Sequence, residues 1–242
     1  MEPTLFDRRS KALLDRFDHG QQRARRAERP FMVELLGTSN SGKTTLMDRL
    51  YTEFKGMGYQ VAKVPEGAEV IPPPRMLPVY NLETGDYAVG RARRLAYDRN
   101  IHLAIFDRAI FDTAVWLEIY RTRGLISEEE HDAFSRTYLS RFNRELFDLH
   151  VFLVCGPEKA LARKYGGEGY AAREARGEVA YGKTTNPAAL AASLAAHETV
   201  WNRHGSDPRL FWVDTTELDA GGVAEHVFEA CLQAFERRLM SP

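Results

Sequence analysis

The chain has 242 residues, of which 44% are hydrophobic and 28% charged, and its formal net charge is -1. This composition is ordinary for a soluble globular protein with a substantial core. The near-zero charge excludes a global field that would attract nucleic acid or a membrane surface, and no apolar run approaches the ~20 residues that cross a bilayer. The charge therefore argues against a nucleic-acid partner, although a nucleic-acid end kinase with a local basic groove stays open. We expect no membrane anchor.

The two cysteines, Cys155 and Cys231, lie far apart and belong to no C-x-x-C pair, so a zinc site is not expected. Cys155 ends the apolar run VFLVC and is expected to pack in the core. A reduced, cytoplasmic chain is the simplest interpretation. The start, MEPTLFDRRSKALLDRFDHG, carries too much charge for a secretory signal. The sequence leaves a homodimer open.

Residues 1–29 are rich in charge and end in QQRARRAER. Their apolar residues form one weak helical stripe, made of Leu5, Phe6, Leu13, Leu14 and Phe17. We interpret this segment as a helical extension that precedes a main domain over residues 30–242. Its arginines are either a solvated helix face, which we favour, or a contact for RNA or acidic partners.

The main domain alternates strand and helix patterns in chain order. Strands are expected over residues 31–36, 60–64, 101–106, 149–155 and 210–213. Helices are expected over residues 45–54, 82–99, 111–120, 127–147 and 223–239, the fourth opening on a capping box, Ser127 and Glu130. The alternation predicts an α/β three-layer sandwich with a five-stranded, mostly parallel sheet. Such sheets bind ligands beyond the carboxyl ends of their strands.

A phosphate-binding loop follows the first strand directly. Gly37 to Thr44 (GTSNSGKT) matches GxxxxGK[ST] at every fixed position, with a strand before it and a helix after it. Lys43 is expected to contact the β- and γ-phosphates of ATP, and Thr44 to ligate Mg²⁺. The predicted nucleotide-binding set is Gly37, Thr38, Ser39, Asn40, Ser41, Gly42, Lys43, Thr44 and Thr45. The fold class is therefore that of a P-loop NTPase.

Polar residues also follow the next two strands. Asp107-Arg108 ends the third strand, where an acid can hold Mg²⁺ and an arginine can clamp an anionic oxygen. The alternative is a surface pair that caps the following helix. Glu66, after the second strand, faces the phosphate loop and can accept a proton from a bound hydroxyl. The alternative is a solvent-exposed loop residue.

A Gly- and Arg-rich segment, roughly residues 158–186, follows the fourth strand. Phosphoryl transfer needs positive charge on the migrating group and the exclusion of water, and a mobile flap with arginines supplies both. We interpret the segment as an Arg-bearing lid, with Arg173 and Arg176 as the candidate catalytic arginines. An exposed helix with charges on its wet side is the alternative.

Together the phosphate loop, Val64-Pro65-Glu66-Gly67, Phe106-Asp107-Arg108 and the flap resemble the P-loop nucleoside and nucleotide kinases. The likeness is strongest to deoxynucleoside kinases, with thymidylate kinases as cousins. It implies that Glu66 is the general base. The E-R-S motif of the family reads Asp107-Arg108-Ala109 here, closer to the D-R of thymidylate kinases.

These features predict an ATP- and Mg²⁺-dependent kinase with a small-molecule acceptor. The first candidate acceptor is a nucleoside, at its 5′-hydroxyl, or a nucleoside monophosphate. The catalytic set is Glu66, Lys43, Arg108, Arg173 and Arg176, and the metal set is Thr44 and Asp107. Another hydroxylated metabolite or an antibiotic stays open as the acceptor. An ATP-hydrolysing switch also stays open, although the sequence has no N-K-x-D motif.

Overall fold

The computed structural model describes residues 5–18, 29–72, 78–166, 170–177 and 179–240. Its centre is a five-stranded sheet whose paired strands all run parallel, in the order β2-β3-β1-β4-β5. The strands are β1 (Phe31–Gly37), β2 (Val61–Val64), β3 (Leu103–Asp107), β4 (Leu149–Val154) and β5 (Leu210–Asp214). The predicted α/β sandwich is confirmed, and its sheet is entirely parallel.

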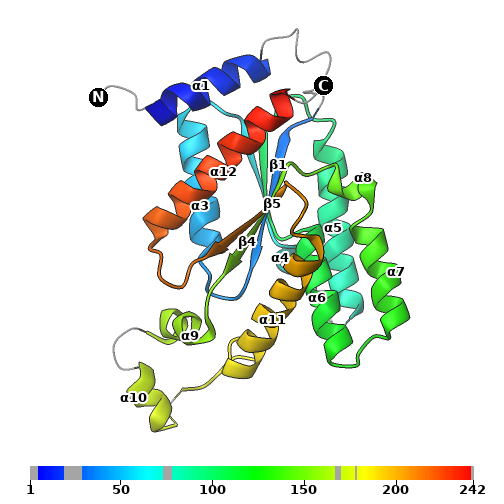
Figure 1. The fold of residues 1–242 in the computed structure, drawn as a ribbon, viewed down its shortest axis with the longest axis vertical. Helices are drawn as coiled ribbons and strands as arrows, with labels where there is room; N and C mark the ends of the chain where they lie inside the picture. Colours follow the sequence, from blue (N-terminus) through cyan, green and yellow to red (C-terminus); the bar gives the residue numbers. More distant parts are fainter. Residues whose placement is uncertain (1–4, 19–28, 73–77, 167–169, 178, 241–242) are drawn as a thin grey trace.

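Helices cover both faces of the sheet (Figure 1). One face carries α1 (Leu5–Asp18), α3 (Lys43–Gly56) and α12 (Ala220–Met240). The other carries α5 (Val79–Leu95), α6 (Ile110–Thr122) and α11 (Pro187–His204), and α7 (Glu128–Tyr138) packs against α6. Each face has its own hydrophobic core, and β1 contributes to both because its side chains alternate. Phe31, Val33 and Leu35 enter the first core, and Met32 and Leu36 the second.

The helix predicted over residues 127–147 is wrong in extent, because the structure divides it. The predicted capping box of Ser127 and Glu130 is present, but α7 ends before Leu139, and α8 (Arg141–Arg144) starts after Ser140. Ser140 has an extended ψ of 153°, and the Asn143 amide donates to the oxygen of Thr137 at 3.0 Å. This side-chain bond pairs a carbonyl at the end of α7.

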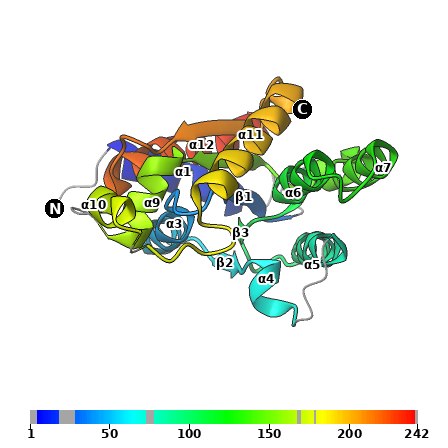
Figure 2. The ribbon, with the colours of Figure 1, turned by 90° about the horizontal axis from the view of Figure 1, so that it is seen from below.

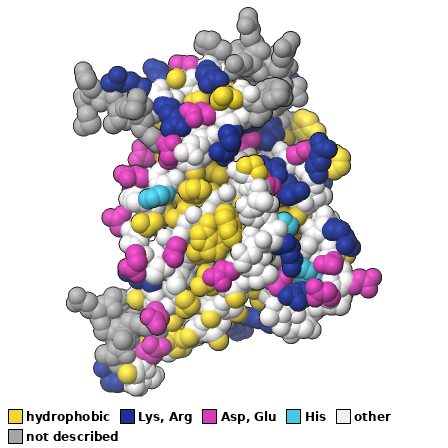
Figure 3. All heavy atoms as spheres, in the orientation of Figure 1, with side chains coloured by type: hydrophobic (Ala, Val, Ile, Leu, Met, Phe, Trp, Pro, Cys, Tyr) yellow, Lys and Arg dark blue, Asp and Glu magenta, His cyan; other side chains and the backbone are white. Residues whose placement is uncertain are grey.

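The predicted N-terminal helix is present as α1 and packs against α12. Arg9 forms ion pairs with Glu229 at 2.8 Å and Glu236 at 2.6 Å, while Leu13 and Leu14 are buried in the first core. Of the basic run QQRARRAER, residues 21–28 lie outside the described residues, and Arg29 pairs with Asp148 at 2.7 Å. Within the described part, no helix is long and apolar enough to cross a membrane. On the face in Figure 3, acidic and basic side chains are intermixed.

The carboxyl ends of the strands form one edge of the sheet. Figure 2 looks onto this edge and shows α3, α4 (Gly67–Val70), α6, α9 (Pro157–Tyr165) and α11 around it. The segment predicted as a lid contributes α9 and α10 (Tyr170–Ala175), which project below the sheet in Figure 1. The candidate site is therefore built at the edge where parallel-sheet proteins bind ligands.

Candidate active site

The phosphate loop joins the end of β1 to the start of α3, as predicted. Gly37 packs so closely on β4 that a Cβ atom there would lie 1.8 Å from the backbone oxygen of Leu153. Gly42 has a φ of 93°, a left-handed value that favours glycine. The two fixed glycines of the motif therefore have different physical causes, a close backbone approach at Gly37 and a backbone conformation at Gly42.

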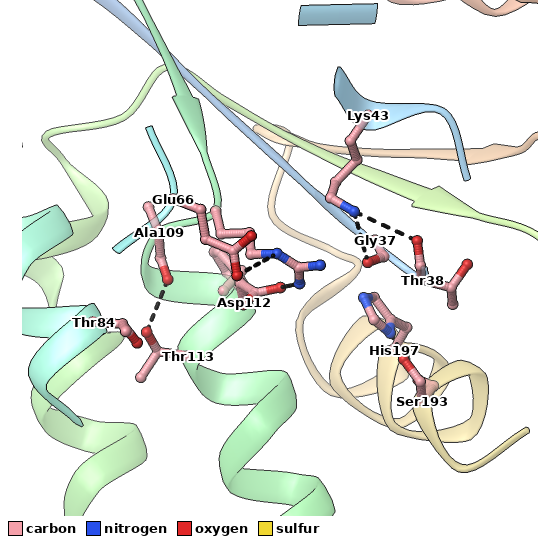
Figure 4. Close-up of polar contacts among 12 residues, drawn as sticks. Gly37, Thr38, Lys43, Glu66, Thr84, Ala109, Asp112, Thr113, Ser193 and His197 are labelled. Atoms are coloured by element: carbon pink, nitrogen blue, oxygen red, sulfur yellow. Dashed lines mark hydrogen bonds and ion pairs between the residues drawn. The ribbon is translucent and has the colours of Figure 1, made fainter. Parts of the chain in front are cut away.

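Lys43 folds back over the loop (Figure 4). Its Nζ donates to the carbonyl oxygen of Gly37 at 3.3 Å and to that of Thr38 at 3.5 Å. Burial and the nearby Arg108 lower the pKa of Lys43 to about 8. Two long hydrogen bonds are weak compensation for a desolvated ammonium, so Lys43 keeps donor capacity for an anionic ligand.

Several polar atoms around the loop are buried and have no hydrogen-bond partner among the described residues: Asn40 Nδ2, Ser41 Oγ and Asp107 Oδ1. Buried polar groups are almost always paired in native proteins, so these atoms have hydrogen-bonding capacity left for a bound group. The set fits a phosphate chain with a divalent cation. Thr44, the predicted metal ligand at the start of α3, and Thr45 are exposed beside it.

Two predicted site residues, Thr38 and Asp107, lie at the ends of different strands: Thr38 follows β1 and contacts the end of β4, and Asp107 ends β3. Thr38 is buried, and its Oγ1 accepts a hydrogen bond from the backbone of Cys155 at 3.0 Å, so its hydroxyl ties the loop to β4. Asp107 ends β3 directly opposite Leu35 of β1. Burial raises the pKa of Asp107, while Lys43 and Arg108 oppose the shift. A partly buried carboxylate near Lys43 fits the metal role that the sequence predicts for it.

Arg108 connects the ends of two strands through its guanidinium. Its Nε lies 3.2 Å from Glu66 Oε1, an ion-pair distance without hydrogen-bond alignment, and its Nη1 donates to Asp112 Oδ1 at 2.5 Å. Burial opposes the charge of Arg108, but Asp112, Glu66 and Asp107 together raise its pKa. Burial raises the pKa of Asp112 to about 6. The structure thus brings the predicted Glu66, Asp107 and Arg108 together with Lys43.

A pocket opens between the phosphate loop, α6 and α11. Among the described residues, its lining includes three cationic side chains, Arg108, Arg123 and Lys183, and no acid. His197 of α11 also lines it and is buried, with Nδ1 donating to the oxygen of Ser193 at 2.7 Å and Nε2 unpaired. Burial lowers the pKa of His197 to about 3. The imidazole is therefore neutral and turns toward the phosphate loop (Figure 4).

The arginines of the predicted lid are divided between two positions. Arg173 and Arg176 are exposed, and Arg173 Nη1 donates to the oxygen of Tyr165 at 3.1 Å. Arg163 of α9 instead donates to the oxygens of Asn40 at 3.3 Å and Thr215 at 2.5 Å. Arg163 therefore anchors α9 to the phosphate loop, and the two candidate catalytic arginines lie farther along the segment.

The sequence does not single out Asp112, Arg123 or His197, which pair with Arg108 or line the pocket, nor Glu34, which binds the first turn of α6. Asp112 and His197 reach the site from helices whose packing the sequence pattern does not specify. Glu34 is fully buried in β1. Its signal in the sequence is a charged residue within the apolar run FMVELL.

Comparison with solved structures gives two informative likenesses. The chain is similar to a deoxyadenosine kinase from M. mycoides with bound dATP, at 17% identity, with 82% of this chain and 98% of that chain covered and a TM-score of 0.51. It is also similar to a thymidylate kinase from Candida albicans, at 13% identity, with coverages of 87% and 94% and a TM-score of 0.55. No family model and no curated protein matches the sequence.

The parallel sheet, the phosphate loop and the flanking helices define an α/β P-loop NTPase fold. Within that class, the chain has the fold of the P-loop nucleoside and nucleotide kinases. The resemblance predicted from the motifs is thus confirmed for the fold. At these identities the likeness does not extend to substrate, which has to be argued from the residues of the site.

Proposed function

We propose that the protein is an ATP- and Mg²⁺-dependent kinase that acts on a nucleoside, at its 5′-hydroxyl, or on a nucleoside monophosphate. The observation that carries the proposal is the contact of Glu66 with Arg108, within electrostatic reach of Lys43. A carboxylate, a guanidinium and a phosphate loop at one sheet edge provide a proton acceptor, charge for the migrating group and a cradle for the donor.

In the proposed reaction an oxygen of the acceptor attacks the γ-phosphorus of ATP. The bond from that phosphorus to the β–γ bridging oxygen breaks, and ADP leaves. Glu66 orients an attacking hydroxyl and takes its proton, whereas an acceptor phosphate oxygen has none to lose. Lys43 and Arg108 stabilise the charge on the migrating group. Mg²⁺, held by Thr44 and Asp107, would add positive charge at the phosphates.

The lining of the pocket supports a phosphate-bearing ligand with a flat ring. Arg108, Arg123 and Lys183 favour an anion, and Trp116 and Val115 offer apolar surface beside them. In the proposed closed state, Arg173 and Arg176 approach the migrating phosphoryl group and exclude water. The same proposal includes a cytoplasmic location, a kinase domain over residues 30–242 and a possible homodimer.

The test is ADP formation by the purified protein with Mg²⁺-ATP, measured alone and with separate nucleosides, nucleoside monophosphates, sugars and oligonucleotides. The proposal predicts that a nucleoside or a monophosphate raises the rate at least tenfold above the rate with ATP alone. Lys43→Ala abolishes this stimulation, while Lys55→Ala retains it, because Lys55 is exposed on the same helix away from the loop. ATP consumption that no acceptor stimulates would instead identify a hydrolase or switch.

A further inference from the structure

Glu34 is a fully buried carboxylate in the middle of β1. It faces the α6 side of the sheet together with Met32 and Leu36, where the alternation of the strand calls for an apolar residue. A carboxylate without partners is very costly in such a place. The structure therefore has to provide strong compensation for this charge.

The compensation comes from the first turn of α6. Glu34 Oε1 accepts hydrogen bonds from the backbone nitrogens of Ala109 at 2.7 Å, Asp112 at 3.0 Å and Phe111 at 3.1 Å. These are free amides at a helix N-terminus, where negative charge is stabilised. The N-cap residue itself, Ala109, has no side chain that can cap the helix. Glu34 thus caps α6 from another strand.

A second buried group completes the arrangement. His150 of β4 is the direct neighbour of Glu34 in the sheet, and its Nδ1 lies 2.7 Å from Glu34 Oε2. Both side chains have 0% exposure. The carboxylate is consequently held by three backbone amides on one side and by an imidazole on the other, which fixes its position between the central strands and α6.

The capped turn begins at the residue after Arg108. Arg108 has a φ of 63°, a left-handed value that is uncommon for a residue other than glycine. Its own nitrogen donates to the oxygen of Leu35 at 2.9 Å, and the next nitrogen in the chain donates to Glu34. Two bonds to β1 therefore hold the strained residue, and strain at such sites persists only where the surroundings impose it.

We propose that Glu34, supported by His150, is a positioning residue that holds Arg108 in this left-handed conformation and so directs its guanidinium to the migrating phosphoryl group. The role rests on the proposed kinase activity. Glu34 is fully buried and is bonded to the first turn of α6 and to His150, so it acts on the site through Arg108. Its loss therefore impairs transfer without removing a group that contacts the nucleotide.

Steady-state kinetics of Glu34→Gln test this role, because the glutamine keeps the shape and weakens the bonds to the amides. We expect kcat to fall about 10- to 100-fold, since small misplacement of a catalytic group costs that much, with a KM for ATP within about threefold of wild type. Asp148→Asn is the matched control. Asp148 is also a buried carboxylate, paired with Arg29 and Arg238 at the opposite end of the sheet, so its variant loses stability and keeps kcat.

A double-mutant cycle with Arg108→Ala separates positioning from general destabilisation. If Glu34 acts through Arg108, Glu34→Gln has little further effect on kcat in the Arg108→Ala background. Effects of the two substitutions on kcat that multiply independently would overturn the role.

The Arg108 Nε–H signal in ¹⁵N NMR, assigned by its loss in Arg108→Ala, gives a readout without turnover. We expect Glu34→Gln to shift or broaden it, and an unchanged signal would refute the positioning role. Failure of the wild-type protein to phosphorylate any acceptor would refute the kinase proposal, and the NMR comparison would still decide the role of Glu34.

Discussion

The guanidinium of Arg108 lies 3.2 Å from the carboxylate of Glu66, so the ends of β3 and β2 meet beside the phosphate loop. Arg108 is also paired with Asp112, which keeps it charged within a buried site. In the proposed reaction the migrating phosphoryl group competes with these carboxylates for Arg108. A bound substrate therefore releases Glu66 to act on the acceptor.

Replacement of Glu66 by Gln should lower kcat with a hydroxyl acceptor by roughly 100-fold or more, since general-base catalysis typically contributes 10²- to 10⁴-fold. The KM for ATP should change little, because Glu66 belongs to the acceptor side. Steady-state rates of ADP formation measure both. Glu69→Gln, an exposed glutamate on α4, is the control and should match wild type. Equal kcat values for Glu66→Gln and wild type would remove Glu66 from the mechanism.

Replacement of Lys43 by Met should stabilise the ligand-free protein while abolishing its stabilisation by ATP. Burial lowers the pKa of Lys43 to about 8, so the charged lysine costs stability below pH 8, and this cost disappears as the pH rises toward 10.5. Because Lys43 is only partly buried, we expect a gain of about 1–2 kcal/mol at pH 7, discounted for solvent screening. Urea unfolding from pH 7 to 10.5 measures it.

The matched control for this prediction is Lys55→Met, which removes an exposed lysine from the same helix. It should leave both the stability and the ATP-dependent shift in melting temperature near their wild-type values. Two results would contradict this account of Lys43 as a buried ammonium that costs stability and binds phosphate. One is a Lys43→Met protein less stable than wild type at pH 7, and the other is a Lys43→Met protein that ATP still stabilises fully.

The buried imidazole of His197 should make the protein sensitive to acid. Burial lowers the pKa of His197 to about 3. Below pH 6.5 the imidazole therefore binds a proton in the unfolded chain but not in the folded chain. Stability is then lost as the pH falls from 6.5 toward 3, by about 1.4 kcal/mol per pH unit for one such group. Denaturant unfolding at pH 6.5 and pH 5 should show a smaller loss for His197→Gln than for wild type.

His226 provides a closely matched comparison for that experiment. Its Nδ1 donates to the oxygen of Gly222 at 2.7 Å, as His197 does to Ser193 four residues earlier in its own helix, but His226 is exposed. His226→Gln should therefore keep the wild-type pH dependence. If both variants lose the same acid sensitivity, burial of His197 is not its cause.

The lid arginines should act on turnover and not on folding. Arg173 and Arg176 are exposed, so their replacement by Ala should change the free energy of unfolding by less than about 0.5 kcal/mol. If either reaches the migrating group in a closed state, kcat should fall at least tenfold. Arg141→Ala, an exposed arginine on α8, is the control. Unchanged kcat in the Arg173 and Arg176 variants would exclude these side chains from catalysis.

The sequence predicted the features that depend on local chain geometry. Gly37 to Thr44 run from the last residue of β1 into the first turn of α3, as the motif and its flanking patterns predict. Glu66 and Arg108 are far apart in the chain, yet their proximity was also predictable, because both follow parallel strands and the carboxyl ends of such strands share one edge.

Features that depend on the packing of distant segments were not predicted. Glu34 and His150 become neighbours only because β1 pairs with β4 in one register, and no local pattern specifies that pairing. His197 reaches the phosphate loop because α11 packs beside α6. The break after α7 also escaped the periodicity, since it depends on the contact of Asn143 with Thr137 and not on a proline or glycine.

The most direct test of the kinase proposal follows the phosphoryl group itself. ATP labelled with ¹⁸O in its γ-phosphoryl group is incubated with Mg²⁺, the protein and the acceptor that best stimulates ADP formation, and the products are analysed by mass spectrometry. We predict that wild type places the label in a phosphorylated nucleoside or nucleoside diphosphate, and that Lys43→Ala does not. Label found only in inorganic phosphate would contradict the assignment of this protein as a nucleoside or nucleotide kinase.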